Sequence, residues 1–460
     1  MAITADVLLA VSPNKSSPPT ISVANTNPSK FPTRSFEVPA PGEELEIDAN
    51  AHDWSNYFKA GLRGAYGILK EKNGTNFQSV GMDILMDGTV PAGGGLSSSA
   101  AFVCAASLAS VKANGLEKVD KTQLTELAIV SERAVGVNSG GMDQAASVFS
   151  QRDAGLLIAF KPKLKATPIS IPASLPGNKN LAFLIAQSFI TSNKRVTGPI
   201  HYNLRVVECT LAALYLSKVL KVSKLPEDAS PLGQSLRGLQ DAYFDEHGDG
   251  SVPDPTKDAA SAQKYMSQLE KLVQIVEDYM VQEEGYTRED ISKILGISVD
   301  ELNERYTTKV PIRADRFKLR QRALHVFSEA LRVQRFVAIL NDEKQRASPD
   351  LYEKIGKLVS EVQDSCRDQY ECSTPELDQI CSISRREGGY GGRLTGAGWG
   401  GCSVHLVPEE KVEAVRQAWT KEYYNVKFPE LSKEELDEAI VVSKPGRGSL
   451  IYESCAHGRV

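Results

Sequence analysis

The segment between residues 91 and 101 reads Pro91-Ala92-Gly93-Gly94-Gly95-Leu96-Ser97-Ser98-Ser99-Ala100-Ala101. Its three consecutive glycines allow the backbone to approach a bound phosphate and to adopt dihedral angles that other residues avoid. The three serines would lie where a helix begins, where backbone N–H groups lack internal partners and the helix dipole is positive. This segment therefore predicts a binding site for a phosphorylated ligand.

The residues on either side place this segment between a strand and a helix. Residues 81–90 alternate roughly as a strand does, and residues 100–113 form a continuous run of small and apolar side chains. Glycine-rich turns before serine also occur as plain loop-to-helix joints, but this order of strand, turn, serines and helix favours the anion site. A Walker A loop is excluded because no lysine follows the glycines before the serines, and the protein-kinase glycine loop is absent.

Composition and charge restrict the class of protein. The chain has 460 residues with 41% hydrophobic and 24% charged side chains, which predicts a globular protein of two domains. A net charge of -5 without any Lys/Arg-rich run favours a small-molecule substrate over direct nucleic-acid binding. No C-x-x-C pair, histidine cluster, signal peptide or long apolar run is present, so we expect a cytoplasmic protein with reduced thiols and no membrane association.

Hydrophobic periodicity predicts a chain that mixes helices and strands. Strands are expected over about 1–11, 81–90, 156–160, 181–186 and 402–407, and those at 156–160 and 181–186 are expected to be buried. Helices are expected over about 53–70, 100–113, 122–135, 200–219, 263–283, 288–295, 316–340 and 351–364. A second glycine-rich stretch lies at residues 388–402, and it contains Leu394 and Trp399. Flexible linkers contain serine and proline instead, so we expect a tight loop that approaches the nucleotide or the first glycine segment across a domain cleft.

Two carboxylates are candidates for the chemistry of a phosphate site. Asp143 follows two glycines and Met142, and Glu132 lies eleven residues earlier at the end of a predicted helix. Phosphoryl transfer needs a cation at the phosphates and a carboxylate near the attacking hydroxyl, roles that Glu132 (with a serine hydroxyl, for Mg²⁺) and Asp143 could fill. Spacing alone leaves open a solvated helix charge for Glu132 and a cap for Asp143.

Three motifs together are similar to those of a known family. Residues 91–101 (P-x-G-G-G-L-S-S-S-A-A), 132–146 (E-x-x-x-G-V-x-x-G-G-M-D-Q-A-A) and 394–402 (L-T-G-A-G-W-G-G-C) resemble the GHMP small-molecule kinases, and among them the fungal galactokinases. The resemblance extends over nearly the whole chain. It implies an α+β fold of two domains with mixed β-sheets covered by helices and an active site in the interdomain cleft. The N-terminal domain would span residues 1–185 and the C-terminal domain residues 186–460, with a helical insert at about 225–310.

The resemblance also implies an activity, which is transfer of the ATP γ-phosphate to the anomeric hydroxyl of galactose, with ATP and Mg²⁺ as cofactors. Asp143 would act on that hydroxyl as base or as electrostatic partner, Gly141 and Tyr202 would contact the sugar together with Asp143, and Ser99 and Glu132 would bind Mg²⁺. The nucleotide-binding residues would be Gly93, Gly94, Gly95, Leu96, Ser97, Ser98, Ser99, Asn193 and Lys194.

The sequence departs from the galactokinase pattern at its start. Galactokinases have an early signature, G-R-V-N-L-I-G-E-H-x-D-Y, which supplies an arginine beside the catalytic aspartate and side chains that hold the sugar hydroxyls, and it does not occur here. Two interpretations follow: an incomplete gene model, or a shortened relative with weak or no activity. The competing functions are a galactose- and ATP-binding regulator that contacts a transcriptional repressor, and a GHMP kinase for another substrate such as N-acetylgalactosamine or mevalonate. The intact run at residues 97–101 favours the enzyme over the regulator.

Overall fold

The structure is a computed structural model that describes residues 1–48, 51, 53–91, 95–132, 135, 140–161, 163–175, 179–191, 197–248 and 250–452. The chain divides into two compact units. The first comprises Met1–Ala173 with Val442–Val460, and the second comprises Ser174–Val441. Both combine helices with β-sheet, as expected for an α+β protein.

The first unit is built on a mixed sheet of four strands. They are β1 (Val7–Asn14), β2 (Thr20–Asn25), β3 (Arg34–Glu37) and β4 (Gly81–Gly88), in the spatial order β1-β4-β2-β3. Strand β4 is antiparallel to β1, with Leu9 opposite Met86, and parallel to β2, with Val23 opposite Ile84. The expected first strand therefore exists, but it begins at Val7 rather than at the first residue.

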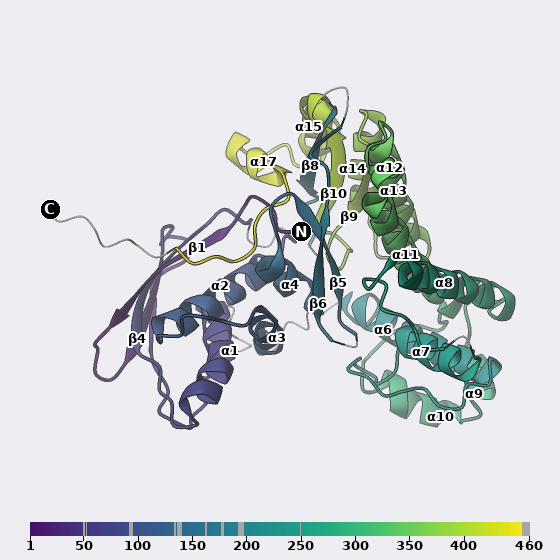
Figure 1. Cartoon of the computed structure of the whole chain (residues 1–460), viewed down its shortest axis with the longest axis horizontal. Coiled ribbons are helices and arrows are strands. Elements are labelled where there is room, and N and C mark those ends of the chain that lie inside the picture. Colours follow the sequence, from purple (N-terminus) through teal and green to yellow (C-terminus); the bar gives the residue numbers. More distant parts are fainter. Residues whose placement is uncertain are drawn as a thin grey trace. The chain divides into compact units, whose positions relative to one another are not determined.

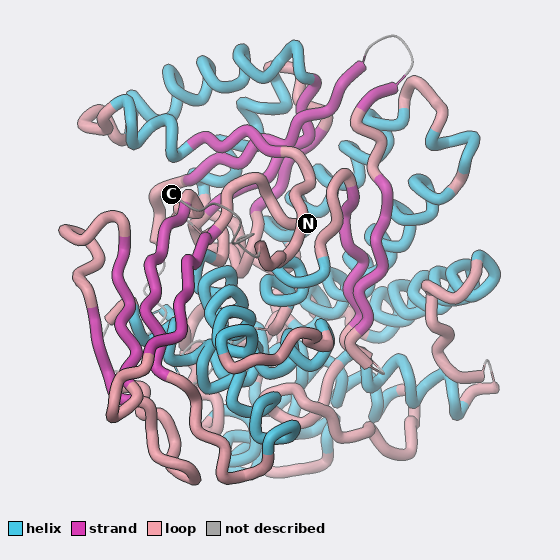
Figure 2. The backbone as a smooth tube through the Cα atoms, turned by 60° about the vertical axis from the view of Figure 1, so that its left-hand side comes forward, coloured by secondary structure: helices cyan, strands magenta, loops and turns pink. Residues whose placement is uncertain are grey.

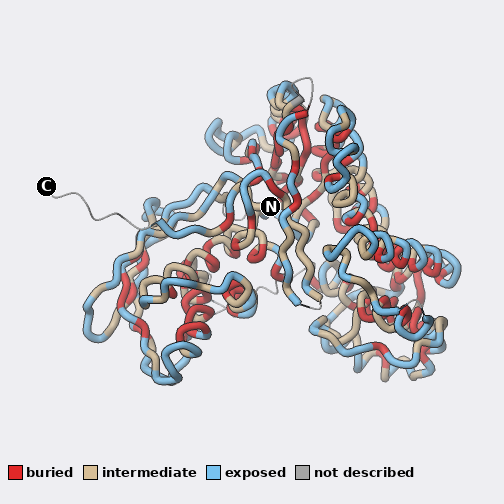
Figure 3. Tube along the Cα trace, in the orientation of Figure 1, coloured by how far each residue is buried: buried red, intermediate tan, exposed pale blue. Residues whose placement is uncertain are grey.

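Four helices of this unit provide the rest of its core. They are α1 (Ser55–Asn73), α2 (Ser98–Ala113), α3 (Lys121–Glu132) and α4 (Met142–Phe149). In Figure 1 helices α1 and α2 lie beside one face of the sheet, and Figure 3 shows that both contain buried positions. Helices α1 and α2 are in close contact because Gly61 has no side chain: a Cβ there would lie 2.5 Å from Ala106 Cβ.

A separate two-stranded sheet and the C-terminal segment complete the first unit. Strands β5 (Ala154–Ala159) and β6 (Lys165–Ser170) form an antiparallel ribbon, visible as paired magenta strands in Figure 2. The prediction of a buried strand at 156–160 is wrong in this respect. Among the described strands β5 pairs only with β6, so most of its residues stay partly exposed. The C-terminal segment packs on this unit, since Gly448 N donates to Ser150 O at 2.8 Å.

Helices dominate the first part of the second unit. They are α6 (Tyr202–Val219), α7 (Leu236–Glu246), α8 (Ala259–Tyr279), α9 (Arg288–Leu295), α10 (Val299–Leu302), α11 (Leu319–Asn341) and α12 (Glu343–Arg346). The segment at 225–310 is helical, and its helices share one core with α6 and α11, in which Leu211, Leu272 and Phe327 are buried. These helices therefore bury one side of α6, the helix that begins at Tyr202.

The sheet of the second unit has the order β11-β8-β10-β9, with β7 paired to β8. Its strands are β7 (Ser174–Leu175), β8 (Lys179–Gln187), β9 (Gly391–Leu394), β10 (Cys402–Pro408) and β11 (Ile440–Ser443). The accompanying helices are α13 (Leu351–Asp368), α14 (Pro375–Arg386), α15 (Val412–Trp419), α16 (Asn425–Lys427) and α17 (Lys433–Ala439). Within the part of the chain described, no helix is long and apolar enough to cross a membrane.

Candidate active site

The serine cluster lies at the start of helix α2, as predicted. The helix begins at Ser98, and Gly95 and Ser97 precede it with φ of +75° and +57°. The Ser97 side chain does not cap the helix, although its carbonyl accepts from Ala101 N at 3.1 Å. The first-turn N–H groups, including those of Ser98 and Ser99, are thus at the positive end of a 16-residue helix, where an anion is favoured. Gly93 and Gly94 lie outside the described residues.

Glu132 is the last residue of α3, and it is buried, with 1% of its surface exposed. The alternative of a solvated helix charge is therefore wrong for this residue. The Gln144 side-chain amide donates to Glu132 Oε2. The pKa of Tyr57 is raised, first by burial and then by the negative charge of Glu132. A buried carboxylate at the negative end of a helix is stabilised by donors or cations, so this position suits a cation-binding group.

Asp143 lies in the first turn of α4, which begins at Met142. The N-cap of this helix is Gly141, so Asp143 is not the N-cap that its sequence position also allowed. A carboxylate in the first turn interacts favourably with the helix dipole. The side chain is partly exposed, and this position leaves it accessible to a ligand.

The three helices α2, α3 and α4 pack against one another. Cys104, on α2, lies 4.0 Å from the Gln144 carbonyl oxygen. Its pKa is raised to about 12, mainly because burial disfavours the thiolate and also because Glu132, and more weakly Asp143, add negative charge. Both carboxylates therefore lie close enough to Cys104 to affect the same thiol. No role for Gln144 was predicted from the sequence, although it belongs to the motif at residues 132–146 and directly follows Asp143.

Gly141, the residue before α4, occupies a position that excludes any side chain. Its φ is +91°, and a Cβ there would lie 2.3 Å from Ile129 Cδ1 and 3.3 Å from Phe160 Cε1. The residue that caps α4 is therefore in close contact with a side chain of α3.

Replacing Gly141 with alanine is expected to lower the free energy of unfolding by about 2–3 kcal/mol, because the methyl group overpacks against Ile129 and the left-handed backbone disfavours a side chain. Urea denaturation measures this change. Gly140→Ala is the matched control, since a Cβ at Gly140 would have no neighbour within 4 Å. Equal stabilities for the two variants would contradict the close contact.

The remaining predicted residues belong to the second unit. Tyr202 is the first residue of α6 and is 41% exposed. Asn193 and Lys194 lie outside the described residues. The second glycine stretch is tight rather than a flexible linker: part of it is strand β9, and a Cβ at Gly398 would lie 2.1 Å from Cys372 O and one at Gly400 would lie 2.2 Å from Ile190 O.

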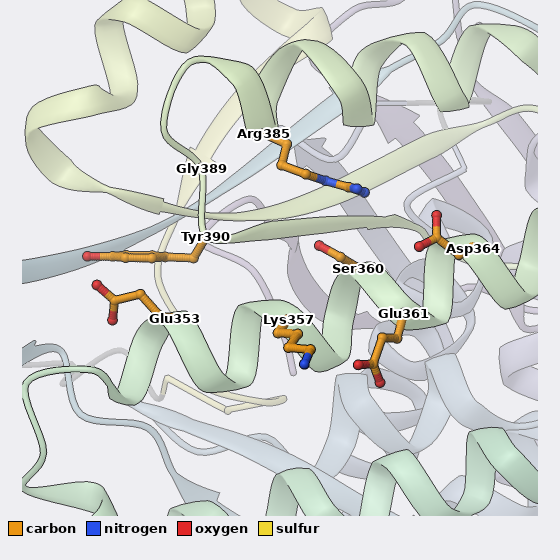
Figure 4. Close-up of a pocket in the computed structure, with 8 residues that line it drawn as sticks. All are labelled: Glu353, Lys357, Ser360, Glu361, Asp364, Arg385, Gly389 and Tyr390. Atoms are coloured by element: carbon orange, nitrogen blue, oxygen red, sulfur yellow. The ribbon is translucent and has the colours of Figure 1, made fainter.

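A pocket of about 480 Å³ lies at helices α13 and α14 and contains none of the predicted site residues (Figure 4). It is lined by Glu353, Lys357, Ser360, Glu361, Asp364, Arg385, Gly389 and Tyr390. Its lining mixes acidic and basic side chains. The described residues also include no group of three or more His, Cys, Asp or Glu side chains arranged to hold a metal ion. Mg²⁺ keeps several waters and uses one or two protein carboxylates, so a site formed by Glu132 and a serine hydroxyl does not require such a group.

Comparison with known proteins places these features in a family. Residues 56–151 match the N-terminal domain of the GHMP kinases, and residues 348–425 match their C-terminal domain. The galactokinase of Saccharomyces cerevisiae is 42% identical over 465 aligned residues, which cover 98% of this chain and 87% of the yeast protein. The galactokinase of Schizosaccharomyces pombe is 37% identical, with the same coverage of both chains. The crystal structure of Lactococcus lactis galactokinase complexed with galactose has the same fold, with a TM-score of 0.58 at 19% identity over 97% of this chain and 87% of that chain.

Proposed function

Because this chain belongs to the GHMP kinase family, and within it to the galactokinases, we propose that it transfers the γ-phosphoryl group of ATP to the anomeric hydroxyl of galactose. The product is galactose 1-phosphate, with ADP as the second product. The observation that carries this proposal is the identity of 42% and 37% with two fungal galactokinases, in alignments that cover 98% of the chain. Nothing observed favours a transcriptional regulator.

In this proposal the start of α2 binds the phosphates of ATP. Gly95, Leu96 and Ser97–Ser99, together with Gly93 and Gly94, contribute backbone N–H groups and hydroxyls, and the dipole of α2 favours the negative charge. Asn193 and Lys194 would also bind the nucleotide, as the resemblance to the family implies. Ser99 and Glu132 would hold Mg²⁺, and their hard oxygen atoms and the burial of Glu132 fit that ion. When bound, Mg²⁺ would neutralise phosphate charge.

Asp143 acts on the sugar. Its carboxylate accepts the proton of the anomeric hydroxyl as that oxygen attacks the γ-phosphorus, or it stabilises the hydroxyl electrostatically. Gly141 and Tyr202 contact the sugar and orient it. The side-chain amide of Gln144 donates a hydrogen bond to one oxygen of the Glu132 carboxylate. This hydrogen bond restrains the orientation of the carboxylate.

The three motifs divide between the proposed domains. The N-terminal domain, residues 1–185, provides the phosphate segment, Glu132 and Asp143, and the C-terminal domain, residues 186–460, provides Tyr202 and the second glycine stretch. A cytoplasmic location and the absence of a nucleic-acid partner remain predictions from composition and cysteine pattern.

The test is product formation by the full-length gene product. With ATP, Mg²⁺ and galactose, ³¹P NMR is expected to show galactose 1-phosphate and ADP in equal amounts, and chelation of Mg²⁺ by EDTA is expected to abolish both signals. N-Acetylgalactosamine and mevalonate, offered separately, test the other substrates. If the protein bound galactose without forming any product, and captured a repressor only when galactose was present, the proposed kinase activity would be overturned in favour of the regulator.

A further inference from the structure

Trp399, in the second glycine stretch, contacts two distant segments of the second unit. It is 8% exposed and has a left-handed backbone with φ of +54°. Its backbone N–H donates to Cys372 O at 2.7 Å, and its indole Nε1 donates to Glu371 O at 3.0 Å. Its ring stacks on His201, with ring centroids 4.9 Å apart and an interplanar angle of 5°. The glycine stretch is thus fastened both to the loop after α13 and to the residue before α6.

Arg205, one turn into α6, reinforces this attachment. Its guanidinium carbon lies 5.7 Å from the centre of a ring of Trp399. The same guanidinium donates to Tyr370 O at 2.5 Å and to Glu371 O at 3.2 Å. The loop that accepts hydrogen bonds from Trp399 is therefore also held by Arg205. Each of three segments, the first turn of α6, the glycine stretch and the loop after α13, therefore contacts the other two.

The start of α6 depends on these contacts because its own cap is weak. His201 is the N-cap residue, and its side chain makes no capping hydrogen bond. The pKa of His201 is lowered, first by burial and then by the charge of Arg205, which disfavours the charged form of the ring. The indole of Trp399 covers that ring. The position of His201 therefore affects the orientation of Tyr202, the first residue of α6.

We propose that Trp399 is a positioning residue for the sugar, which acts through His201 and Arg205 to hold Tyr202. This inference rests on the proposed function, in which Tyr202 contacts galactose. Through Trp399, the second glycine stretch would contribute to sugar binding in addition to any role at the phosphates. Loss of the indole should let the first turn of α6 move. Galactose affinity should then fall more than ATP affinity.

The experiment compares Trp399→Leu, which removes both the stack and the Nε1 donor, with Trp399→Phe, which keeps an aromatic ring. Trp399→Leu is expected to raise KM for galactose about 10-fold, within the coupling range of residues in contact, and KM for ATP by a smaller factor. Trp399→Phe is expected to recover part of this loss. Galactose-induced thermal stabilisation gives the affinity independently of turnover and should weaken in the same order.

Trp419→Leu is the matched control. Trp419 is fully buried in the same unit, and its Nε1 donates to Ile380 O at 2.9 Å, so its loss also removes a buried indole and its hydrogen bond. That variant is expected to lose stability without a change in KM for galactose. An equal rise in KM for Trp419→Leu would show that general destabilisation explains the effect, and would overturn the proposal.

Tyr202→Ala supplies the decisive comparison. If Trp399 acts through Tyr202, Trp399→Leu should raise KM for galactose much less in the Tyr202→Ala background than in the wild-type protein. Fully additive effects would overturn the proposal, because Trp399 would then act on the sugar by another route. Failure of the proposed function is seen separately, in a wild-type protein that neither phosphorylates galactose nor is stabilised by it, and that result would overturn both inferences.

Discussion

Replacing Asp143 with asparagine is expected to lower kcat for galactose phosphorylation by about 10²- to 10⁴-fold, the usual contribution of a positioned general base. Asparagine has nearly the same shape but cannot accept the hydroxyl proton and bears no negative charge. The side chain is partly exposed in the first turn of α4, so the substitution leaves the core intact. The loss of its favourable interaction with the helix dipole costs at most about 1 kcal/mol.

Steady-state kinetics with the full-length protein, and a thermal melt, measure this prediction. The expected result is a fall in kcat with little change in the melting temperature or in KM for ATP. Asp87→Asn is the matched control, because Asp87 is an exposed carboxylate of β4 that accepts a hydrogen bond from Thr26 Oγ1 at 2.7 Å. A kcat for Asp143→Asn within a factor of three of the wild-type value would contradict the assigned role.

Replacing Glu208 with glutamine is expected to lower the free energy of unfolding by about 3–5 kcal/mol, the cost of breaking a buried ion pair. Glu208, on α6, is 1% exposed. Its Oε2 lies 3.0 Å from Arg205 Nη1 and 2.7 Å from Arg322 Nε, and its Oε1 accepts from Lys318 N at 2.8 Å. Both arginines are themselves buried, so a neutral glutamine leaves two guanidinium charges with less compensation.

Urea denaturation of the purified protein measures this loss. Glu270→Gln is the control, because Glu270 pairs with Arg335 at 2.9 Å with both side chains about half exposed. A surface pair of this kind contributes about 0–1 kcal/mol. If Glu208→Gln cost no more than Glu270→Gln, the buried cluster would not stabilise the second unit. The prediction would then be wrong.

Features that depend only on residues close together in the sequence could be predicted from it. The helix begins within the serines, at Ser98, because the alanine-rich residues that follow favour helix and Gly95 before them takes a left-handed backbone without steric cost. Helices α1, α6, α11 and α13 lie within a few residues of the predicted ranges, since amphipathic periodicity is a local property. The family could also be recognised, because its motifs are short and contiguous.

Burial and partners could not be predicted in the same way. Glu132 ends a helix whose periodicity allowed a solvated side chain, and only the packing of α2 and α4 against α3 buries it. Strand β5 looked like a buried strand because its residues are apolar, but its exposure depends on how many neighbours the sheet provides. Gln144 acquired its role from a contact with Glu132 that no spacing rule specifies.

The amino-acid sequence was sufficient to identify the phosphate segment, its helix, the two candidate carboxylates and the family, because each depends on local backbone preference or on contiguous motifs. Three features are visible only in the folded chain: Glu132 is buried, Glu208 lies between two arginines, and Trp399 stacks on His201. Glu208 and Arg322 are separated by 114 residues, and Trp399 and His201 also come from segments far apart in the chain. Their contacts follow from the packing of whole helices and loops, which no short stretch of sequence encodes.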